Sequence, residues 1–481
     1  MFNKAKAYYS KLTPALKAGL WFTICNLLQK GISFITIPIF TRIMPTEEYG
    51  LYSIYISWYS VMTIFATLHL SYYVFNKGLV RYEEDRDNFV VSIQSLSASV
   101  TIGFIIIYIA LRSIIDSFTK IPSAMMICML VQILFEPPVL YWTARKRFEY
   151  KYQAVVAVTI ALSLLNPIIG IVLIKLHVFS NDAITRAFSL ALVSVIFGVV
   201  IGISIIKKAG RPFLTKYWKY ALAFNLPLIP HYLSTTILSS ADRIMIGDMC
   251  GNSDAAIYSV AYTIGMVCTL FSQAIHQAFL PWLYKRMKIE DYHGIPKISN
   301  AFLAFIIGIL CLLICFAPEV VVIVGSHKYL DAMWAIPPVC GSIFFIFLQN
   351  LFANIEYYFE KTKLIAIASV GVALLNILLN YIFIQMFGFI AAAYTTLVCY
   401  IVYAIIHYFV MCHICTQNHV NIQNLFNMRI VCLFSLAILV IVGVMLVVYH
   451  YPMVRYATII IIIVVFLGIR KQIIDILKSV K

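Results

Sequence analysis

The sequence predicts an all-α polytopic membrane protein with about fourteen transmembrane helices, and three observations support this. Of its 481 residues 62% are hydrophobic and only 12% are charged, whereas a soluble domain carries about 25% charged residues. Apolar runs of about 18 residues or more recur along the chain, each long enough to cross a hydrocarbon layer of about 30 Å. These runs are continuous rather than alternating, which argues against a transmembrane barrel.

The expected spans follow one another with short connections, the longest of about 12 to 16 residues, which lie well below the size of a soluble domain. No phosphate-binding loop of the form GxxxxGK[ST] occurs, so we expect no ATP-driven step and no cofactor. The spans are expected near 15–41, 50–75, 88–111, 121–144, 152–174, 184–206, 218–241, 255–282, 297–317, 332–355, 364–386, 389–411, 429–449 and 455–469.

The net charge of +16 is explained by membrane orientation, since cytoplasmic loops are enriched in Lys and Arg. With the N-terminus inside, the basic segments 144–151, 207–219, 284–297 and 470–481 are all cytoplasmic. The inside segments then hold about 27 Lys and Arg, against about 8 in the outside loops. We therefore expect cytoplasmic termini, no nucleic-acid partner, and no cleavable signal peptide, because the first span is too long for one.

Most of the eleven cysteines lie within the expected spans, where cysteine is a small apolar residue. The segment "CHICTQNH" (412–419) is the one stretch with metal-like spacing. A structural zinc site needs four converging ligands in a domain that holds them, and this segment is a short loop after a span. The interpretation we favour is a pair of thiols at the membrane edge, with no metal.

The chain resembles itself at a separation of about 200 residues. "TRIMPTEEYGLYS" (41–53) is similar to "DRIMIGDMCGNSDAAIYS" (242–259), so that Arg42 corresponds to Arg243. Six spans separate each matching pair, which predicts two parallel repeats around a central cavity, a recurrent transporter plan. The expected domains are an N-terminal six-helix bundle (1–210), a C-terminal six-helix bundle (211–415), and an additional helix pair with a basic cytoplasmic tail (416–481).

The first span carries a polar stripe in an otherwise apolar helix. Thr23, Asn26, Lys30 and Ser33 step by three or four residues and fall within roughly 80° of one another. A charge in mid-bilayer facing lipid costs at least about 2.5–3.5 kcal/mol. Lys30 should therefore face a wet cavity, or pair with a buried carboxylate, for which Glu136 is the candidate. Both possibilities stay open from the sequence.

Two further spans carry proline beside a titratable residue. Glu136 precedes Pro137 and Pro138, which break the helix hydrogen-bond ladder, and His231 follows Pro230 in the seventh span. Either residue could take up a proton as the helix rearranges, so both are candidates for ion coupling. The alternative for each is a hydrogen-bonded structural role.

The eighth span contains "FSQAIHQAF" (271–279), where Gln273, His276 and Gln277 were expected on one polar face of a cavity. These side chains could bind sugar hydroxyls or simply link neighbouring helices. Arg42 and Arg243 end their spans near acidic residues, so they form interfacial salt bridges or bind phosphate oxygens by their guanidinium forks.

The segment 226–262, the loop 41–53 and the segment 360–408 with its "FGFIAAA" turn carry a family resemblance. They resemble signatures of the O-antigen and capsule type of polysaccharide repeat-unit flippases. These belong to the multidrug/oligosaccharidyl-lipid/polysaccharide exporter superfamily. The resemblance covers nearly the whole chain.

The resemblance implies a non-enzymatic transporter of a bacterial cytoplasmic (inner) membrane. Its substrate would be an oligosaccharide on a polyprenyl (undecaprenyl) diphosphate, moved to the outer leaflet by alternating access. The glycan polymerase and chain-length regulator of the same pathway would be partners, beside membrane lipids. The resemblance supports Lys30 as a cavity cation, and Arg42 and Arg243 less strongly. Alternatives are a peptidoglycan-precursor flippase, a cation-coupled multidrug or metabolite exporter, and a membrane-embedded polymerase or ligase, which would need a large periplasmic loop.

Overall fold

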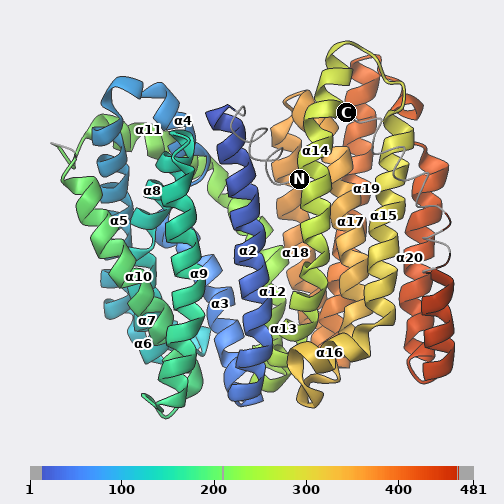
Figure 1. Cartoon of the computed structure of the whole chain (residues 1–481), viewed down its shortest axis with the longest axis horizontal. Coiled ribbons are helices and arrows are strands. Elements are labelled where there is room, and N and C mark those ends of the chain that lie inside the picture. Colours follow the sequence, from blue (N-terminus) through green and yellow to red (C-terminus); the bar gives the residue numbers. More distant parts are fainter. Residues whose placement is uncertain (1–12, 209–210, 463, 465–467, 469–481) are drawn as a thin grey trace, which may run out of the picture. The chain divides into compact units, whose positions relative to one another are not determined.

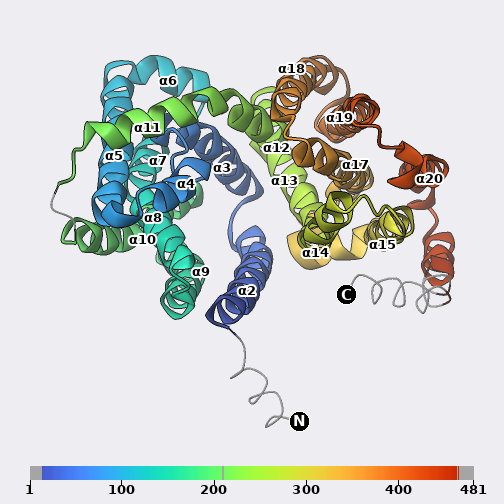
Figure 2. The same cartoon turned by 90° about the horizontal axis from the view of Figure 1, so that it is seen from above.

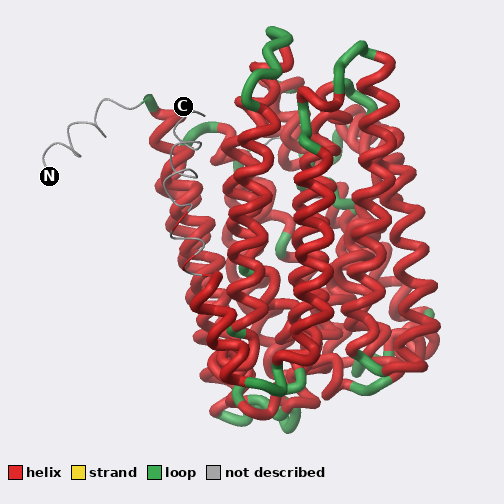
Figure 3. Tube along the Cα trace, turned by 90° about the vertical axis from the view of Figure 1, so that its right-hand side faces the viewer, coloured by secondary structure: helices red, strands yellow, loops and turns green. Residues whose placement is uncertain are grey.

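The computed structural model describes residues 13–208, 211–462, 464 and 468. Across these residues the secondary structure is helical and no strand occurs (Figure 3). Eleven helices in the described part are long and apolar enough to cross a membrane. The protein is therefore an all-α, multi-pass membrane protein, as the sequence predicts. The expected basic tail (470–481) and the first lysines (within 1–12) lie outside the described residues.

Within the described residues, helix is found in each of the fourteen expected spans, and eleven helices there meet the criteria of length and apolarity. The span expected near 218–241 is interrupted, because Pro227 and Pro230 divide it into α11 (Thr215–Asn225), a 3-10 turn and α12 (Ile229–Met249). The last expected span begins as a short apolar helix, Pro452–Ile462, and its remainder lies largely outside the described residues.

The chain divides into two compact units, residues 1–236 and 237–481, so the division falls within α12. The expected domain boundaries at residues 210 and 415 stay predictions. Figures 1 and 2 show the helices of the first unit standing side by side, with α11 lying across one end of the bundle. Its other helices are α2 (Pro14–Ile43), α3 (Thr46–Thr67), α4 (Tyr73–Arg81), α5 (Arg86–Ala110), α6 (Arg112–Thr119), α7 (Ser123–Phe135), α8 (Pro137–Phe148), α9 (Tyr152–Lys175) and α10 (Asp182–Ile206).

The fourth expected span is broken at Glu136 into α7 and α8, where Pro137 and Pro138 provide no backbone N–H. The break packs against two glycines of α10, Gly198 and Gly202. A Cβ built on Gly198 would lie 2.8 Å from the carbonyl carbon of Phe135 and closer still to its oxygen. A GxxxG spacing lets helix backbones approach closely. Here the two glycines leave room for the backbone at the break and so fix the position of Glu136.

An aromatic core joins α11 to the adjoining helices of the first unit. Tyr217 packs edge-on against Phe89 at 5.5 Å between ring centroids, and Phe75 packs against Tyr141 at 4.8 Å. All four rings are fully buried. Trp218 Nε1 also donates to the Ser92 carbonyl at 2.9 Å. These contacts anchor an amphipathic helix across the end of the bundle.

The second unit is built around α17 (Ala332–Tyr358), most of whose side chains are buried. Gly388, with φ +73°, forms the tight turn of the "FGFIAAA" segment between two neighbouring helices. Figure 2 shows α17 between α18, α19, α13 and α15. The unit contains α13 (Asn252–Met266), α14 (Cys268–Lys288), α15 (Ile295–Cys315), α16 (Ala317–Gly325), α18 (Thr362–Phe387), α19 (Ile390–Gln417) and α20 (Met428–Val448).

Candidate functional site

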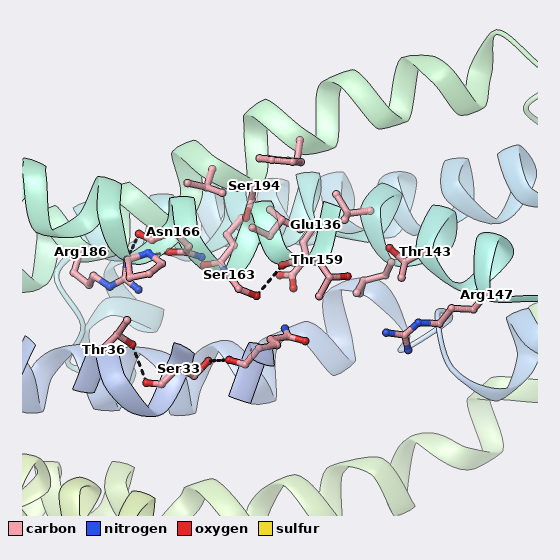
Figure 4. A pocket seen from close by; sticks show the side chains of 18 residues that line it. Ser33, Thr36, Glu136, Thr143, Arg147, Thr159, Ser163, Asn166, Arg186 and Ser194 are labelled. Carbon is pink, nitrogen blue, oxygen red and sulfur yellow. Dashed lines mark hydrogen bonds between the residues drawn. The ribbon is translucent and has the colours of Figure 1, made fainter. Parts of the chain in front are cut away.

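The first unit contains a polar pocket between α2, α7, α8, α9 and α10 (Figure 4). Its volume is about 370 Å³, many times the space that one water molecule needs. Hydroxyl, amide and charged side chains from all of these helices face it, in a part of the chain that is otherwise apolar. The polar lining residues are Gln29, Ser33, Thr36, Gln132, Glu136, Thr143, Arg147, Thr159, Ser163, Asn166, Arg186 and Ser194.

Glu136 faces the pocket from the break between α7 and α8, and its carboxylate accepts a hydrogen bond from the Tyr59 hydroxyl of α3. Four residues earlier on each helix, Tyr55 donates to Gln132 Oε1 at 3.1 Å. Residues i and i+4 share one face of a helix. Tyr55 and Tyr59 therefore form two successive hydrogen bonds, to Gln132 and to Glu136, which link α3 to α7 and the residue after it. This pairing holds the half-buried Glu136 carboxylate toward the pocket.

Arg186 lines the same pocket from the first turns of α10 and is only 6% exposed. Its Nη1 donates to the Asn166 carbonyl and to Asn166 Oδ1, both at 3.0 Å, and to Ser189 Oγ at 2.9 Å. The guanidinium lies over the Phe40 ring at 4.5 Å, a favourable cation–π contact. A buried, positively charged group is thus built into the wall of the pocket.

Arg147 lines the pocket from the last turn of α8, and Figure 4 shows Glu136 between it and Arg186. Its neighbour Arg145 is engaged elsewhere, by an ion pair with Glu149 at 2.8 Å. Burial alone would raise the pKa of Glu149, but hydrogen bonds from Lys151 and Arg145 outweigh it and hold the pKa at about 2. Glu149 therefore stays ionised at neutral pH. The guanidinium of Arg147 lies over the Phe22 ring, 5.5 Å from its centroid.

The residues of the predicted polar stripe on α2 lie in two different environments. Ser33 lines the pocket and donates to the Gln29 carbonyl at 2.9 Å. Asn26 and Lys30 are exposed on α2 and are not among the residues that line this pocket. The described partner of Glu136 is Tyr59, and the assignment of Lys30 to a cavity stays a prediction. Of the predicted site residues, the pocket brings Ser33 and Glu136 together.

The two repeat-related arginines both donate to carbonyls of their own helices. Arg42 Nη1 donates to Pro38 at 2.8 Å, and Arg243 Nη1 donates to Ser239 at 3.1 Å. Arg42 is exposed, whereas the half-buried Arg243 lies over the Tyr262 ring at 4.3 Å. Their role in phosphate binding stays a prediction.

The residues of the predicted polar face of α14 differ in their exposure. Gln273 and Gln277 are exposed and His276 is half-buried, while the neighbouring Ser272 is buried. His231 is half-buried in the first turn of α12, with its ring 6.2 Å from that of Tyr232. No contact described for these residues tests their predicted roles.

The second unit holds a buried carboxylate network that sequence reasoning missed. Asp242 is 1% exposed and accepts hydrogen bonds from Tyr258 at 2.5 Å, Asn380 Nδ2 at 2.7 Å and Thr396 at 2.8 Å. The network links α12, α13, α18 and α19. From the sequence, Asp242 is one of the acidic residues near Arg243 at the membrane interface. The hydrogen bonds described for its carboxylate instead come from these three side chains.

A second buried pair joins α17 to α19, where His407 Nδ1 lies 2.6 Å from Glu356 Oε1 and both side chains are fully buried. Neither of the other polar atoms, Glu356 Oε2 and His407 Nε2, has a partner in the described part of the chain. In the "CHICTQNH" segment, Gln417 Nε2 lies 2.9 Å from His413 Nε2. Within the described ranges, no three His, Cys, Asp or Glu side chains are grouped to hold a metal ion.

The sequence contained only weak indications of the functional residues that were not predicted. Arg186 lies two residues inside the expected span 184–206, and the sequence assigned it no role. Asn376 and Asn380 are four apart on one helix face, a spacing typical of interhelical hydrogen bonds. The pairing of Tyr55 and Tyr59 with Gln132 and Glu136 repeats the same spacing on two helices, but the chain gives no sign that those helices are neighbours.

The fold and the polar side chains buried within it define a class: an all-α, multi-pass membrane protein whose interior contains charged groups. The chain is similar in fold to a lipid II flippase, MurJ, in an inward closed conformation. The TM-score is 0.72 at 15% identity, covering 94% of this chain and all of that one. A multidrug resistance transporter of the MATE family and MOP superfamily, in an inward-facing conformation, gives a TM-score of 0.56 at 13% identity over 80% of this chain and 98% of its own.

The chain belongs to the polysaccharide biosynthesis protein family, whose model matches residues 15–287. It is similar to Lsg locus protein 1 of Haemophilus influenzae, with 23% identity over 377 residues, 74% of this chain and 87% of that protein. A further membrane protein of Haemophilus influenzae is 21% identical over 382 residues, again 74% and 87%. The family resemblance inferred from the sequence is thereby confirmed.

Proposed function

We propose that this protein is a flippase for oligosaccharides linked to a polyprenyl diphosphate. It moves them by alternating access from the cytoplasmic to the outer leaflet of a bacterial cytoplasmic membrane. The observation that carries the proposal is membership of a polysaccharide biosynthesis family by a chain whose described part contains eleven helices long and apolar enough to cross a membrane. Such a chain is suited to moving a glycan across the bilayer. The similarity of its fold to that of a lipid II flippase supports this proposal.

The physical task explains the polar residues within the spans. A diphosphate carrying sugars cannot cross hydrocarbon unaided, because burying an unpaired charge is very costly. Lys30, Arg42 and Arg243 are proposed to receive the diphosphate, since charge-assisted bonds to phosphate oxygens are strong. Asn26, Ser33, Gln273, His276 and Gln277 are proposed to bind sugar hydroxyls. The polymerase and chain-length regulator of the pathway are the proposed protein partners.

Ion coupling is part of the proposal, with Glu136 and His231 as the candidate groups. Glu136 is half-buried at a helix break and faces a polar pocket, a position from which a proton can be exchanged as the helices move. The check is whether flipping in vesicles depends on a pH gradient. If neither Glu136→Gln nor His231→Ala alters such a dependence, these two residues do not carry the coupling.

Replacing Lys30 by alanine is expected to lower flipping by at least about ten-fold, the loss for a charge-assisted hydrogen bond of about 1.5–3 kcal/mol. Lys30→Arg keeps the positive charge and should retain much of the activity. Flipping is measured with the purified protein in vesicles containing the lipid-linked oligosaccharide. Lys175, an exposed lysine in the last turn of α9, provides the matched alanine control. Normal flipping by Lys30→Ala would remove this residue from the proposed site.

A further inference from the structure

The buried, unpartnered Nε of the Arg186 guanidinium is the feature of the pocket that the proposed function leaves unused. All three described hydrogen bonds of Arg186 are made by Nη1. Its Nε is buried and has no hydrogen-bond partner in the described part of the chain, and no described carboxylate lies within ion-pair distance of the side chain. A guanidinium binds oxyanions through two parallel N–H donors, and the Nε–Nη2 edge provides such a pair.

The surroundings hold this edge in place. Phe40 lies under the guanidinium plane, Asn166 and Ser189 fix Nη1, and the helix α9 approaches so closely that a Cβ on Gly170 would be 2.7 Å from Nη1. A long side chain normally loses rotamer entropy when it binds a ligand. Arg186 is already ordered by these contacts, so little of that cost remains.

The rest of the pocket suits a group with several oxygens. Hydroxyls of Ser163, Thr159 and Ser194 line it together with the Asn166 amide (Figure 4). A phosphoryl group has more acceptor oxygens than a carboxylate. The Thr159 and Ser194 hydroxyls and the Asn166 amide nitrogen can donate to it, whereas the Ser163 hydroxyl donates to the Thr159 carbonyl at 2.7 Å. Arg186 is four residues from the start of α10 at Asp182, or about 6 Å along the helix.

We propose that the first unit binds a phosphoryl group at the Nε–Nη2 edge of Arg186, inside the pocket between α2 and α7–α10. The group is either the headgroup phosphate of a membrane lipid or a free phosphate or diphosphate. Lys30, Arg42 and Arg243, which are proposed to receive the substrate diphosphate, do not line this pocket, whereas Ser33, proposed to bind sugar hydroxyls, does. The inference does not depend on the proposed function. Glu136 lines the same pocket, so its negative charge opposes the bound anion.

The test measures binding of inorganic diphosphate to the purified full-length protein in detergent by calorimetry. Arg186→Gln is expected to weaken binding at least about ten-fold, and Arg186→Lys, which loses the fork, should also weaken it. Glu136→Gln should bind diphosphate severalfold more tightly, because a repulsive charge is removed. The control is Arg112→Gln on α6, an arginine whose side chain is 58% exposed.

Glu136→Gln keeps the side-chain shape and a carbonyl for the Tyr59 bond, so it reports on the site even where Arg186→Gln fails to fold. Absence of diphosphate binding, equal binding by wild type and both Arg186 variants, or weaker binding by Glu136→Gln would overturn the proposal. The last result would indicate a cation site at Glu136. In nanodiscs, displacement of diphosphate by phosphatidylglycerol, against pure phosphatidylcholine, assigns the site to a lipid headgroup. Undisturbed binding assigns it to free phosphate.

Discussion

Replacing Asp242 by alanine is expected to lower the free energy of unfolding of the second unit by about 2–5 kcal/mol. The substitution leaves three donors, on Tyr258, Asn380 and Thr396, without the carboxylate that they share. Interhelical hydrogen bonds in membranes contribute about 0.6 kcal/mol on average and up to about 1.7, while bonds to charged groups are stronger. All three bonds join separate helices, so their loss should loosen α12 against α13, α18 and α19.

Thermal unfolding of the purified protein in detergent measures this effect. Asp242→Asn keeps one acceptor oxygen and should cost less than the alanine variant. Asp331→Ala is the matched control, because Asp331 is exposed and makes no side-chain capping bond at the start of α17. Equal melting temperatures for Asp242→Ala and Asp331→Ala would show that the network contributes nothing to stability.

Gly198→Ala is expected to disrupt the first unit at the break between α7 and α8. The added methyl group would lie 2.8 Å from the Phe135 carbonyl carbon, and closer to its oxygen, so a backbone segment has to move. Overpacking of a fitted core costs about 1–3 kcal/mol and occasionally more. Because Phe135 precedes Glu136 directly, the displacement should also move the Glu136 carboxylate away from Tyr59.

The measurement is the melting temperature of the variant in detergent, compared with that of Gly103→Ala. A Cβ on Gly103, in α5, would meet no other atom within 4 Å. Alanine is also a better helix former than glycine, so the Gly103 variant should melt at or above the wild-type temperature. A Gly198→Ala protein as stable as the Gly103 variant would contradict the close packing described here.

The fold could be predicted from the sequence because its cause is local. Length and apolarity alone place helices in a bilayer, and helix occupies each of the fourteen expected spans. The interruptions also had local causes, since Pro137 with Pro138 and Pro227 with Pro230 stand where the helices break. In the described residues, eleven of these spans are helices long and apolar enough to cross a membrane.

The candidate site was predicted only in part, because its contacts join distant segments. Glu136 was singled out by its prolines, but its partner Tyr59 stands 77 residues earlier. The bonds of Asp242 to Asn380 and Thr396 cross 138 and 154 residues. Periodicity shows which residues share a face of one helix, and it does not show which helix that face meets. For the same reason the sequence did not indicate that Arg186 lies in the wall of a pocket.

Transport of a glycan and phosphoryl binding at Arg186 are separate properties of the protein, and each can be tested without the other. The first concerns transfer of a lipid-linked head between leaflets, and the second concerns a phosphoryl group held within one bundle. Loss of diphosphate binding without loss of flipping would make Arg186 a lipid or phosphate anchor. Loss of both would place it on the substrate route.

The central claim is tested most directly by flipping of a defined substrate. Vesicles containing the purified protein and a polyprenyl-diphosphate oligosaccharide are probed with a glycan-cleaving enzyme that cannot cross the membrane. The proposed function predicts that substrate from the protected leaflet becomes cleavable in protein-containing vesicles and stays protected in protein-free ones. A peptidoglycan precursor lipid in place of the oligosaccharide distinguishes the two flippase types. Equal protection of the oligosaccharide with and without protein would contradict the account.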